Sequence, residues 1–289
     1  MAVYTEVTDD ALRAFLREYA IGDLVAFRGI AEGVENSNYS LKTSTGDFIL
    51  TLYEKRVDPA ELPWFLGLME HLAKRGIVCP LPVAGRDGAA LAALHRAGAD
   101  YAPERRNALG PSGWAPLLAR GLADGGAAAD AVHPGLGAEL QRALAGILAA
   151  WPGALPRGHI HADLFPDNVF FLDGRLSGLI DFYFAATDLL AYDIAVCLNA
   201  WCFEPDLSFN VTKARAMLRA YAATRPLAAA ELSALPVLCQ GAAIRFALTR
   251  LYDWINTPPG ALVTRKDPME YVRRLRFFLT APDVFADAV

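Results

Sequence analysis

The stretch that decides the fold runs from His159 to Asp193 and reads HIHADLFPDNVFFLDGRLSGLIDFYFAATDLLAYD. Three polar side chains, those of His161, Asp163 and Asn168, fall within one short loop near its start. Taken alone, a His-x-Asp pair of this kind is usually a loop with local hydrogen bonds. The interpretation therefore depends on the residues after the loop.

A β-hairpin is predicted directly after this loop. Residues 169–172 and 176–180 are apolar runs typical of strands. Between them stands Asp173-Gly174, a dipeptide that favours a tight turn because glycine accepts a positive φ without steric cost. Such a hairpin returns the chain to the loop, so we expect Asp181 to lie beside the polar residues that precede the first strand.

Two carboxylates and one amide would then converge on one point. Hard oxygen ligands suit Mg²⁺, which proteins usually hold with one or two carboxylates together with substrate phosphates. Protein kinases use the same order, in which a loop aspartate faces the substrate hydroxyl while an asparagine and a later aspartate bind metal. The complete pattern of Asp163, Asn168 and Asp181, with the hairpin between them, predicts a kinase-like phosphotransfer site.

The bulk composition limits the other classes of function. The chain has 289 residues, of which 54% are hydrophobic, which is enough for one large domain or two lobes. Its net charge of -5 disfavours a nucleic-acid partner, since such proteins are usually basic. Four cysteines show neither a zinc pattern nor a disulfide framework. No basic and apolar leader opens the chain and no long uncharged apolar run occurs, so we expect a cytoplasmic protein without a membrane span.

The N-terminal part of the chain predicts a small sheet. An amphipathic helix is expected over 9–20, followed by strands at 24–30, 38–43 and 48–53. The link between the first two strands, AEGVENS at 31–37, is small and polar. In kinases a strand–turn–strand unit of this kind covers the nucleotide phosphates with backbone N–H groups. An ordinary β-turn is the alternative, because G-x-G-x-x-G is absent.

The nucleotide-binding residues predicted from this unit come from the link and from the strand after it. They are Gly33, Asn36, Ser37, Asn38 and Lys42.

The rest of the chain is predicted to be mostly helical. We expect an N-lobe over 1–88 and a helical C-lobe over 89–289, with the active site between them. Residues 77–83 should be extended because of their prolines, and residues 121–137, rich in glycine, alanine and aspartate, should form a mobile connection. Helices are predicted at 61–75, 89–97, 138–151, 189–202, 212–223, 229–256 and 268–279.

Several segments together resemble the aminoglycoside-phosphotransferase-like kinases, and within that superfamily they are most similar to homoserine kinases. The segments are HADLFPDNVFF (161–171), SGLIDFYFA (177–185) and LLAYDIAVCLNAWCFEP (189–205), and the likeness extends over nearly the whole chain. The resemblance implies a protein-kinase-like α+β fold with a small antiparallel sheet in the N-lobe. It also implies transfer of phosphate from ATP to the hydroxyl of L-homoserine, a step of threonine biosynthesis.

The resemblance assigns roles to the residues of the motif. Asp163 would accept or orient the proton of the substrate hydroxyl, and His161 would brace the catalytic loop. Asn168 and Asp181 would hold Mg²⁺. Asp193, on the helix after the hairpin, resembles the aspartate that anchors the catalytic loop in kinase folds, although a helix cap is an ordinary alternative.

The partners implied are ATP and a small-molecule alcohol, and a homodimer is left open. Recognition of homoserine requires groups for its carboxylate and its ammonium. An arginine can bind a carboxylate with two parallel hydrogen bonds, which makes Arg245 a candidate, although a surface ion pair is the more common role for a helical arginine. The other candidates are Asn199, Trp201 and Tyr252.

Two features depart from the family pattern. The third strand carries Thr51 where kinases place a phosphate-binding lysine, and Lys42 or Lys55 would have to replace it. Only GRDG (85–88) separates the extended segment from the next helix, where the family has further strands and a hinge. Compared with the length that the resemblance implies, roughly 30 residues are missing.

These departures leave two kinds of alternative function. One is a kinase acting on choline, methylthioribose or an aminoglycoside, and the other is a pseudokinase that binds without turnover.

Overall fold

The computed structural model describes residues 7–17, 19–30, 37–52, 61–77, 79, 95, 100–172, 175–257 and 265–286. The chain divides into two compact units. The first unit holds Met1–Ala93 together with Pro258–Thr264, and the second holds Leu94–Thr257 together with Arg265–Val289. The lobe boundary predicted between residues 88 and 89 lies outside the described residues.

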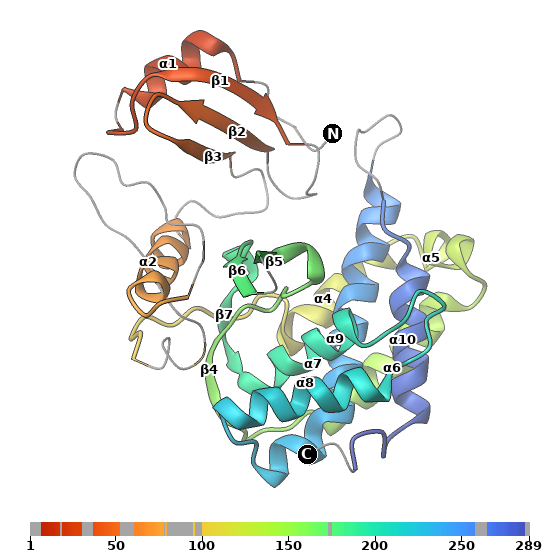
Figure 1. The fold of residues 1–289 in the computed structure, drawn as a ribbon. Coiled ribbons are helices and arrows are strands. Elements are labelled where there is room, and N and C mark those ends of the chain that lie inside the picture. The colour runs from red at the N-terminus through yellow and green to blue at the C-terminus, as the bar shows by residue number, and fades with distance from the viewer. Residues whose placement is uncertain are drawn as a thin grey trace. The chain divides into compact units, whose positions relative to one another are not determined.

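The first unit contains an antiparallel three-stranded sheet with a helix on one face (Figure 1). The helix α1 (Asp9–Leu16) begins where the Thr8 side chain accepts a hydrogen bond from the backbone N–H of Ala11. The strands are β1 (Leu24–Gly29), β2 (Ser37–Thr43) and β3 (Asp47–Leu52), and their order in the sheet is their order in the chain. Side chains on one face of β2 pack with those of α1 in a small core, which includes Leu12, Leu16, Tyr39 and Leu41.

A second helix of this unit, α2 (Leu62–Ala73), comes after the sheet in the chain and carries a proline in its first turn. That position suits proline, because its missing N–H would have no partner within the helix.

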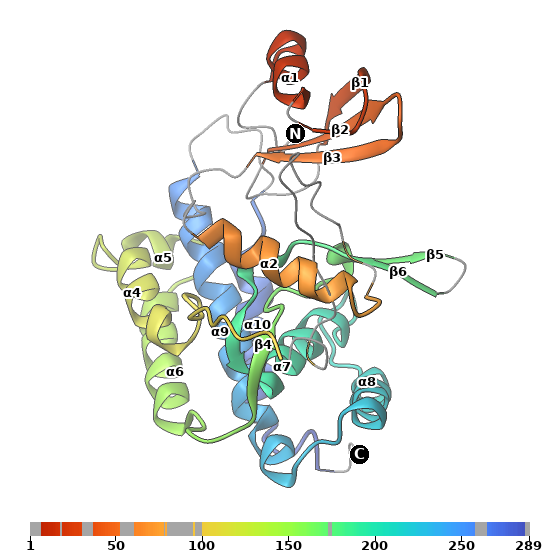
Figure 2. The ribbon, with the colours of Figure 1, turned by 90° about the vertical axis from the view of Figure 1, so that its left-hand side faces the viewer.

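The second unit is built around one long helix. The helix α9 (Ala229–Asn256) packs against α4, α6, α7 and α10 (Figure 2). The other helices are α4 (Pro111–Gly121), α5 (Ala127–Val132), α6 (Leu136–Ala150), α7 (Leu190–Trp201), α8 (Val211–Thr224) and α10 (Pro268–Thr280). By length and composition α9 could cross a membrane, and no other helix among the described residues could. Most of its apolar window is buried inside the unit, which accounts for its composition without a membrane.

Two short strand pairs lie in the segment from 157 to 189. The strand β4 (Arg157–Ile160) pairs antiparallel with β7 (Ala186–Leu189), so that Ile160 lies opposite Ala186. The strand β5 (Val169–Leu172) pairs with β6 (Arg175–Leu179) to form the hairpin. The polar loop therefore starts where one strand pair ends and finishes where the hairpin begins. Both ends of the loop are fixed by backbone pairing.

The predicted fold class is confirmed, since a small antiparallel sheet precedes a mostly helical unit. The helix predicted over 229–256 has the predicted ends, and most other elements agree to within two or three residues. The mobile connection predicted over 121–137 is wrong, because α4 ends within it and α5 and the start of α6 occupy much of it. Of the helix predicted over 89–97, only His95 is among the described residues.

Candidate active site

One buried carboxylate holds the start of the polar loop. The Asp193 side chain, on the first turn of α7, accepts a hydrogen bond at Oδ2 from the backbone N–H of His161 (2.7 Å) and one at Oδ1 from that of Ala162 (2.8 Å). Ala162 has a φ of 61°, a left-handed conformation that costs free energy for a residue with a side chain. The two hydrogen bonds that Asp193 accepts therefore stabilise a strained turn directly before Asp163.

His95 supports Asp193 from another part of the chain. Its Nε2 lies 3.1 Å from Oδ2 of Asp193, and its Nδ1 lies 3.2 Å from the hydroxyl of Tyr221. Burial acts to raise the pKa of Asp193, but the hydrogen bond and charge of His95, together with the backbone N–H of His161, outweigh it. The pKa is therefore lowered, and the carboxylate that anchors the loop stays ionised.

The imidazole of His161 connects the loop with the segment after the hairpin. Its Nε2 lies 2.8 Å from the carbonyl oxygen of Ile180, and because a carbonyl only accepts, Nε2 must carry the proton. The backbone N–H of Ile180 in turn donates to the carbonyl oxygen of Asn168 (3.0 Å). Asp181, the next residue, has a φ of 67°, another left-handed position. These contacts place Asp181 next to the loop, as the hairpin predicts.

Asn168 is oriented by the loop itself. Its Nδ2 donates to the backbone carbonyl oxygen of Asp163 (2.7 Å), and its side chain is buried. With the amide nitrogen engaged, the amide oxygen is directed away from that carbonyl and is available to a ligand. The carboxylate of Asp163 is partly exposed, and its Oδ1 accepts a hydrogen bond from Nη1 of Arg245 (3.0 Å).

Burial and the charge of Asp163 both act on the carboxylate of Asp181. Burial raises the pKa of Asp181 above its ordinary value, and the negative charge of Asp163 raises it further. The hydrogen bond from the hydroxyl of Tyr183 (3.1 Å) opposes this increase. A cation between the carboxylates would relieve both the burial of charge and the repulsion.

These residues fit a magnesium ion. Asn168 offers an oriented amide oxygen, and Asp181 offers a desolvated carboxylate that repels its neighbour. Within the described part of the chain, three or more His, Cys, Asp or Glu side chains do not gather in a way that could hold a metal. An ion here would thus depend on one carboxylate, one amide and oxygens of the substrate, as expected for Mg²⁺ bound with a nucleotide.

The four residues predicted to grip the substrate are dispersed. Asn199 is fully buried and ties two helices together, since its Nδ2 donates to the carbonyl oxygens of Ala195 (3.0 Å) and Cys239 (3.1 Å). The indole N–H of Trp201 donates to the carbonyl oxygen of Leu164 (2.8 Å) and so supports the catalytic loop.

The remaining two substrate candidates lie on α9. Arg245 contacts Asp163 through its guanidinium. Tyr252, two turns farther along the helix and roughly 10 Å along its axis, lies beneath the guanidinium of Arg120. Of the four side chains, only those of Trp201 and Arg245 contact the loop in the structure.

The predicted nucleotide-binding residues fall partly outside the described part of the chain. Gly33 and Asn36 are not among the described residues. Ser37 and Asn38 open β2 and point to opposite faces, because Ser37 is buried with the core side of the strand while Asn38 accepts a hydrogen bond from Thr51 (2.7 Å). Lys42 is exposed at the far end of β2, roughly 16 Å from Ser37 at the rise of an extended strand.

Sequence reasoning missed two residues that support the site. His95 binds Asp193 across 98 positions of the chain, and no local pattern announces such a contact. Tyr183 lies two positions after Asp181, and its hydroxyl binds that carboxylate. The order Asp181-Phe182-Tyr183 could have predicted this contact, because a short turn after an aspartate can bring a tyrosine hydroxyl back to its carboxylate.

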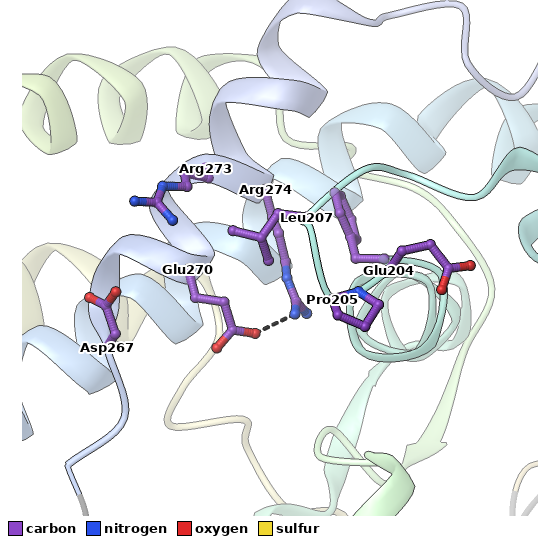
Figure 3. A pocket seen from close by; sticks show the side chains of 8 residues that line it. Glu204, Pro205, Leu207, Asp267, Glu270, Arg273 and Arg274 are labelled. Atoms are coloured by element: carbon purple, nitrogen blue, oxygen red, sulfur yellow. Dashed lines mark hydrogen bonds and ion pairs between the residues drawn. The ribbon is translucent and has the colours of Figure 1, made fainter.

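A separate pocket of about 460 Å³ lies between the loop after α7 and the start of α10 (Figure 3). Phe203, Glu204, Glu270 and Arg274 contribute to its wall, and no residue predicted for the site does. Glu270 is paired with both Arg250 and Arg274, so most of the charge at this wall is already neutralised within the protein.

Comparison with known proteins identifies the family of this chain. The model of the Phosphotransferase enzyme family matches residues 26–90 and 86–227. A homoserine kinase of Acidiphilium cryptum is 68% identical over 97% of this chain and 98% of its own length. A homoserine kinase of Granulibacter bethesdensis is 65% identical over 99% of both chains.

The same alignments bear on the short GRDG link. They span 315 and 320 positions, more than the 289 residues of this chain, so the relatives contain segments that this chain lacks. The two matched segments of the family model meet at 86–90, where the sequence predicts the missing stretch.

Solved structures show the same fold at low sequence identity. A choline kinase from Cryptosporidium parvum superposes with a TM-score of 0.66 at 12% identity, covering 97% of both chains. A spectinomycin phosphotransferase reaches a TM-score of 0.66 at 11% identity and covers 98% of both chains. The fold is therefore shared by kinases whose acceptors differ.

Proposed function

The chain belongs to the homoserine kinases of the phosphotransferase enzyme family, and on that premise we propose that it transfers the terminal phosphate of ATP to the side-chain hydroxyl of L-homoserine. The product, O-phospho-L-homoserine, is an intermediate of threonine biosynthesis. The high identity to curated homoserine kinases over nearly their full length supports the substrate. The observation that supports the chemistry is that Asp163 and Asn168 share one loop and that Ile180, the residue before Asp181, is hydrogen-bonded to Asn168.

Each side chain has a proposed task. Asp163 orients the acceptor hydroxyl and takes its proton as the oxygen attacks phosphorus. Asn168 and Asp181 would hold Mg²⁺, which neutralises charge on the phosphates when it is bound. His161 and Asp193 are assigned the task of fixing the loop, since Asp193 accepts the N–H groups of His161 and Ala162 and the His161 ring donates to the carbonyl oxygen of Ile180.

The nucleotide is proposed to use the sheet of the first unit. Backbone N–H groups of the 31–37 link, with Ser37 and Asn38 at its end, remain the predicted phosphate contacts. Lys42 is the weakest of the predicted contacts, because it is separated from that end of the strand. A cytoplasmic location, without a nucleic-acid or membrane partner, is likewise proposed from composition and from the biosynthetic role of the relatives.

A coupled assay of ADP release tests this function. The purified chain is incubated with ATP and Mg²⁺ and with L-homoserine, choline, methylthioribose or an aminoglycoside. Of these four acceptors we expect only L-homoserine to give ADP release, and we expect a chelator of Mg²⁺ to abolish it. Turnover of another alcohol in preference to homoserine would show that the substrate is wrong while the phosphotransfer chemistry stands.

The shortened link supports a second candidate, a chain that binds without turnover. Relatives carry segments that this chain lacks. The resemblance to the kinase family implies that the adenine-binding hinge belongs in that part of the chain. Calorimetric titration with ATP and Mg²⁺ separates the candidates. Binding at sub-millimolar concentration together with ADP release supports the kinase, whereas no heat at millimolar nucleotide supports the second candidate.

A further inference from the structure

The guanidinium of Arg245 is buried against the catalytic loop. Its side chain is only 3% exposed, and it projects from the middle of α9. Nη1 donates to Oδ1 of Asp163 (3.0 Å) and to the carbonyl oxygen of Ala162 (3.1 Å). The guanidinium carbon lies 3.8 Å from the centre of the Phe246 ring and 5.1 Å from that of Phe184. Stacking on these rings restricts the rotation of the guanidinium.

The peptide groups on either side of Ala162 are held by opposite charges. Asp193 accepts from the N–H of Ala162, and Arg245 donates to its carbonyl oxygen. Ala162 has a left-handed backbone, a conformation that persists only where the surroundings impose it. Two buried charges from two different helices therefore impose the backbone direction in which the chain enters Asp163.

The same arginine also determines which carboxylate oxygen is available. Oδ1 of Asp163 is engaged by Nη1, so rotation about the last side-chain bond is restricted and Oδ2 is left for the acceptor hydroxyl. Holding a reacting group in one geometry lowers the barrier, because its freedom is lost before the substrate arrives. A misplacement of about 1 Å can cost on the order of a hundredfold in rate.

We propose that Arg245 is a positioning residue for Asp163, which holds the carboxylate and the strained turn before it in the orientation that receives the acceptor hydroxyl. The inference rests on the proposed function, since it assigns Asp163 to the hydroxyl. It replaces the sequence-based prediction that Arg245 binds the carboxylate of homoserine. The carboxylate that Arg245 binds in the structure belongs to the protein.

The two roles predict different kinetics. A positioning residue acts after the substrate is bound, so its loss lowers kcat for every alcohol and changes KM little. An arginine that grips the carboxylate of homoserine acts in binding, so its loss raises KM for homoserine. In that case 3-amino-1-propanol, which has the same hydroxyl and ammonium without the carboxylate, would be turned over at an unchanged rate.

The test compares Arg245→Gln and Arg245→Lys with the wild type and with Arg250→Ala. Arg250 lies on the same helix and is also ion-paired, but its partner is Glu270. Steady-state rates are measured with L-homoserine and with 3-amino-1-propanol, and folding is monitored by melting temperature and by ATP binding. If Arg245→Gln does not fold, Arg245→Lys, which keeps the positive charge and an N–H donor group, provides the measurement.

For Arg245→Gln we expect kcat to fall about a hundredfold with each alcohol that the wild type uses, while KM stays within about threefold. Arg245→Lys should recover about tenfold of that loss, and Arg250→Ala should keep the wild-type kcat. A kcat of Arg245→Gln within threefold of wild type, or a rise in KM confined to homoserine, overturns the inference. Absence of turnover in the wild type overturns the proposed function itself, and this role with it.

Discussion

Nε2 of His161 lies 2.8 Å from the carbonyl oxygen of Ile180, and this hydrogen bond joins the two halves of the candidate site. His161 opens the loop that carries Asp163 and Asn168, while Ile180 directly precedes Asp181. The imidazole is fully buried, so the contact is shielded from competing water. The separation between the proposed proton acceptor and the proposed metal ligands therefore depends on one side chain that touches neither substrate.

Replacing His161 with alanine should weaken both the fold and the site. The carbonyl of Ile180 would lose its partner in a buried place, which costs about 1–3 kcal/mol in the free energy of unfolding. We also expect kcat to fall by about tenfold or more, because Asp181 loses its fixed position relative to Asp163. Urea denaturation and the ADP-release assay measure the two effects.

The matched control for this change is His133→Ala. His133 is exposed after α5, so its loss should alter stability by less than about 0.5 kcal/mol. Equal effects of the two substitutions on stability and on kcat would contradict the role given to His161.

Asp193→Asn should disrupt the loop more severely. The substitution keeps the size of the side chain but removes the charge that receives the N–H groups of His161 and Ala162 and the ring of His95. Hydrogen bonds to a charged acceptor contribute about 1.5–3 kcal/mol each, and we expect a loss of about 3 kcal/mol in total because asparagine still accepts one bond. Asp206→Asn, on the surface, serves as the control. Retention of wild-type stability by Asp193→Asn would show that its carboxylate is not needed.

Asn168→Ala should weaken the binding of Mg²⁺ to the site. The variant loses the amide oxygen proposed for Mg²⁺ and the hydrogen bond to the carbonyl of Asp163. We expect the Mg²⁺ concentration for half-maximal rate to rise by at least about tenfold. The neighbouring Asp167 is exposed and pairs only loosely with Lys266 at 3.9 Å, so Asp167→Ala should leave that concentration unchanged. The same Mg²⁺ dependence in both variants would argue against Asn168 as a ligand.

The pairing of Glu139 with Arg276 joins α6 to α10 and gives stability that depends on pH. The hydrogen bond and charge of Arg276 lower the pKa of Glu139 below its ordinary value, against a smaller opposing effect of burial. A lowered folded-state pKa means that the unfolded chain binds the proton more readily. The contribution is then complete above the ordinary glutamate pKa, near pH 4.3, and is lost as the pH falls through the folded value.

Glu139→Gln should therefore be less stable than wild type at neutral pH, by no more than about 1 kcal/mol because both side chains are partly exposed. The difference should remain constant from pH 8 to pH 5 and shrink below about pH 4. Urea denaturation across this range checks the sign. A difference that grows as the pH falls would contradict it.

The sequence predicted the parts of the fold that depend on local patterns. The apolar periodicity of α9 and the hairpin dipeptide at 173–174 are local signals, and the elements formed where they indicated. The helix α4 carries Gly113 and Pro116 inside it, and both residues oppose a helix. It forms because Trp114 is fully buried against Trp151, a tertiary contact that propensity does not record.

The site, like the fold, has parts that local sequence predicts and parts that depend on distant residues. The order of Asp163, Asn168 and Asp181 is written in one stretch of chain, so their proximity follows from the hairpin. The partners that orient them come from elsewhere, since His95 and Arg245 reach the loop across 98 and 82 positions. The sequence around an arginine on an apolar helix does not predict which carboxylate will be its partner. The sequence could therefore name a chemical role for Arg245 but not its partner.

Asp163→Asn provides the most direct test of the central claim, that this loop carries out phosphotransfer with Asp163 as the proton acceptor. The measurement is the rate of phosphate transfer to L-homoserine, with ATP binding followed by calorimetry on the same preparations. We predict that kcat falls by about 10²–10⁴-fold while the affinity for ATP stays within about threefold of wild type. A variant that keeps kcat within tenfold of wild type would contradict the assignment.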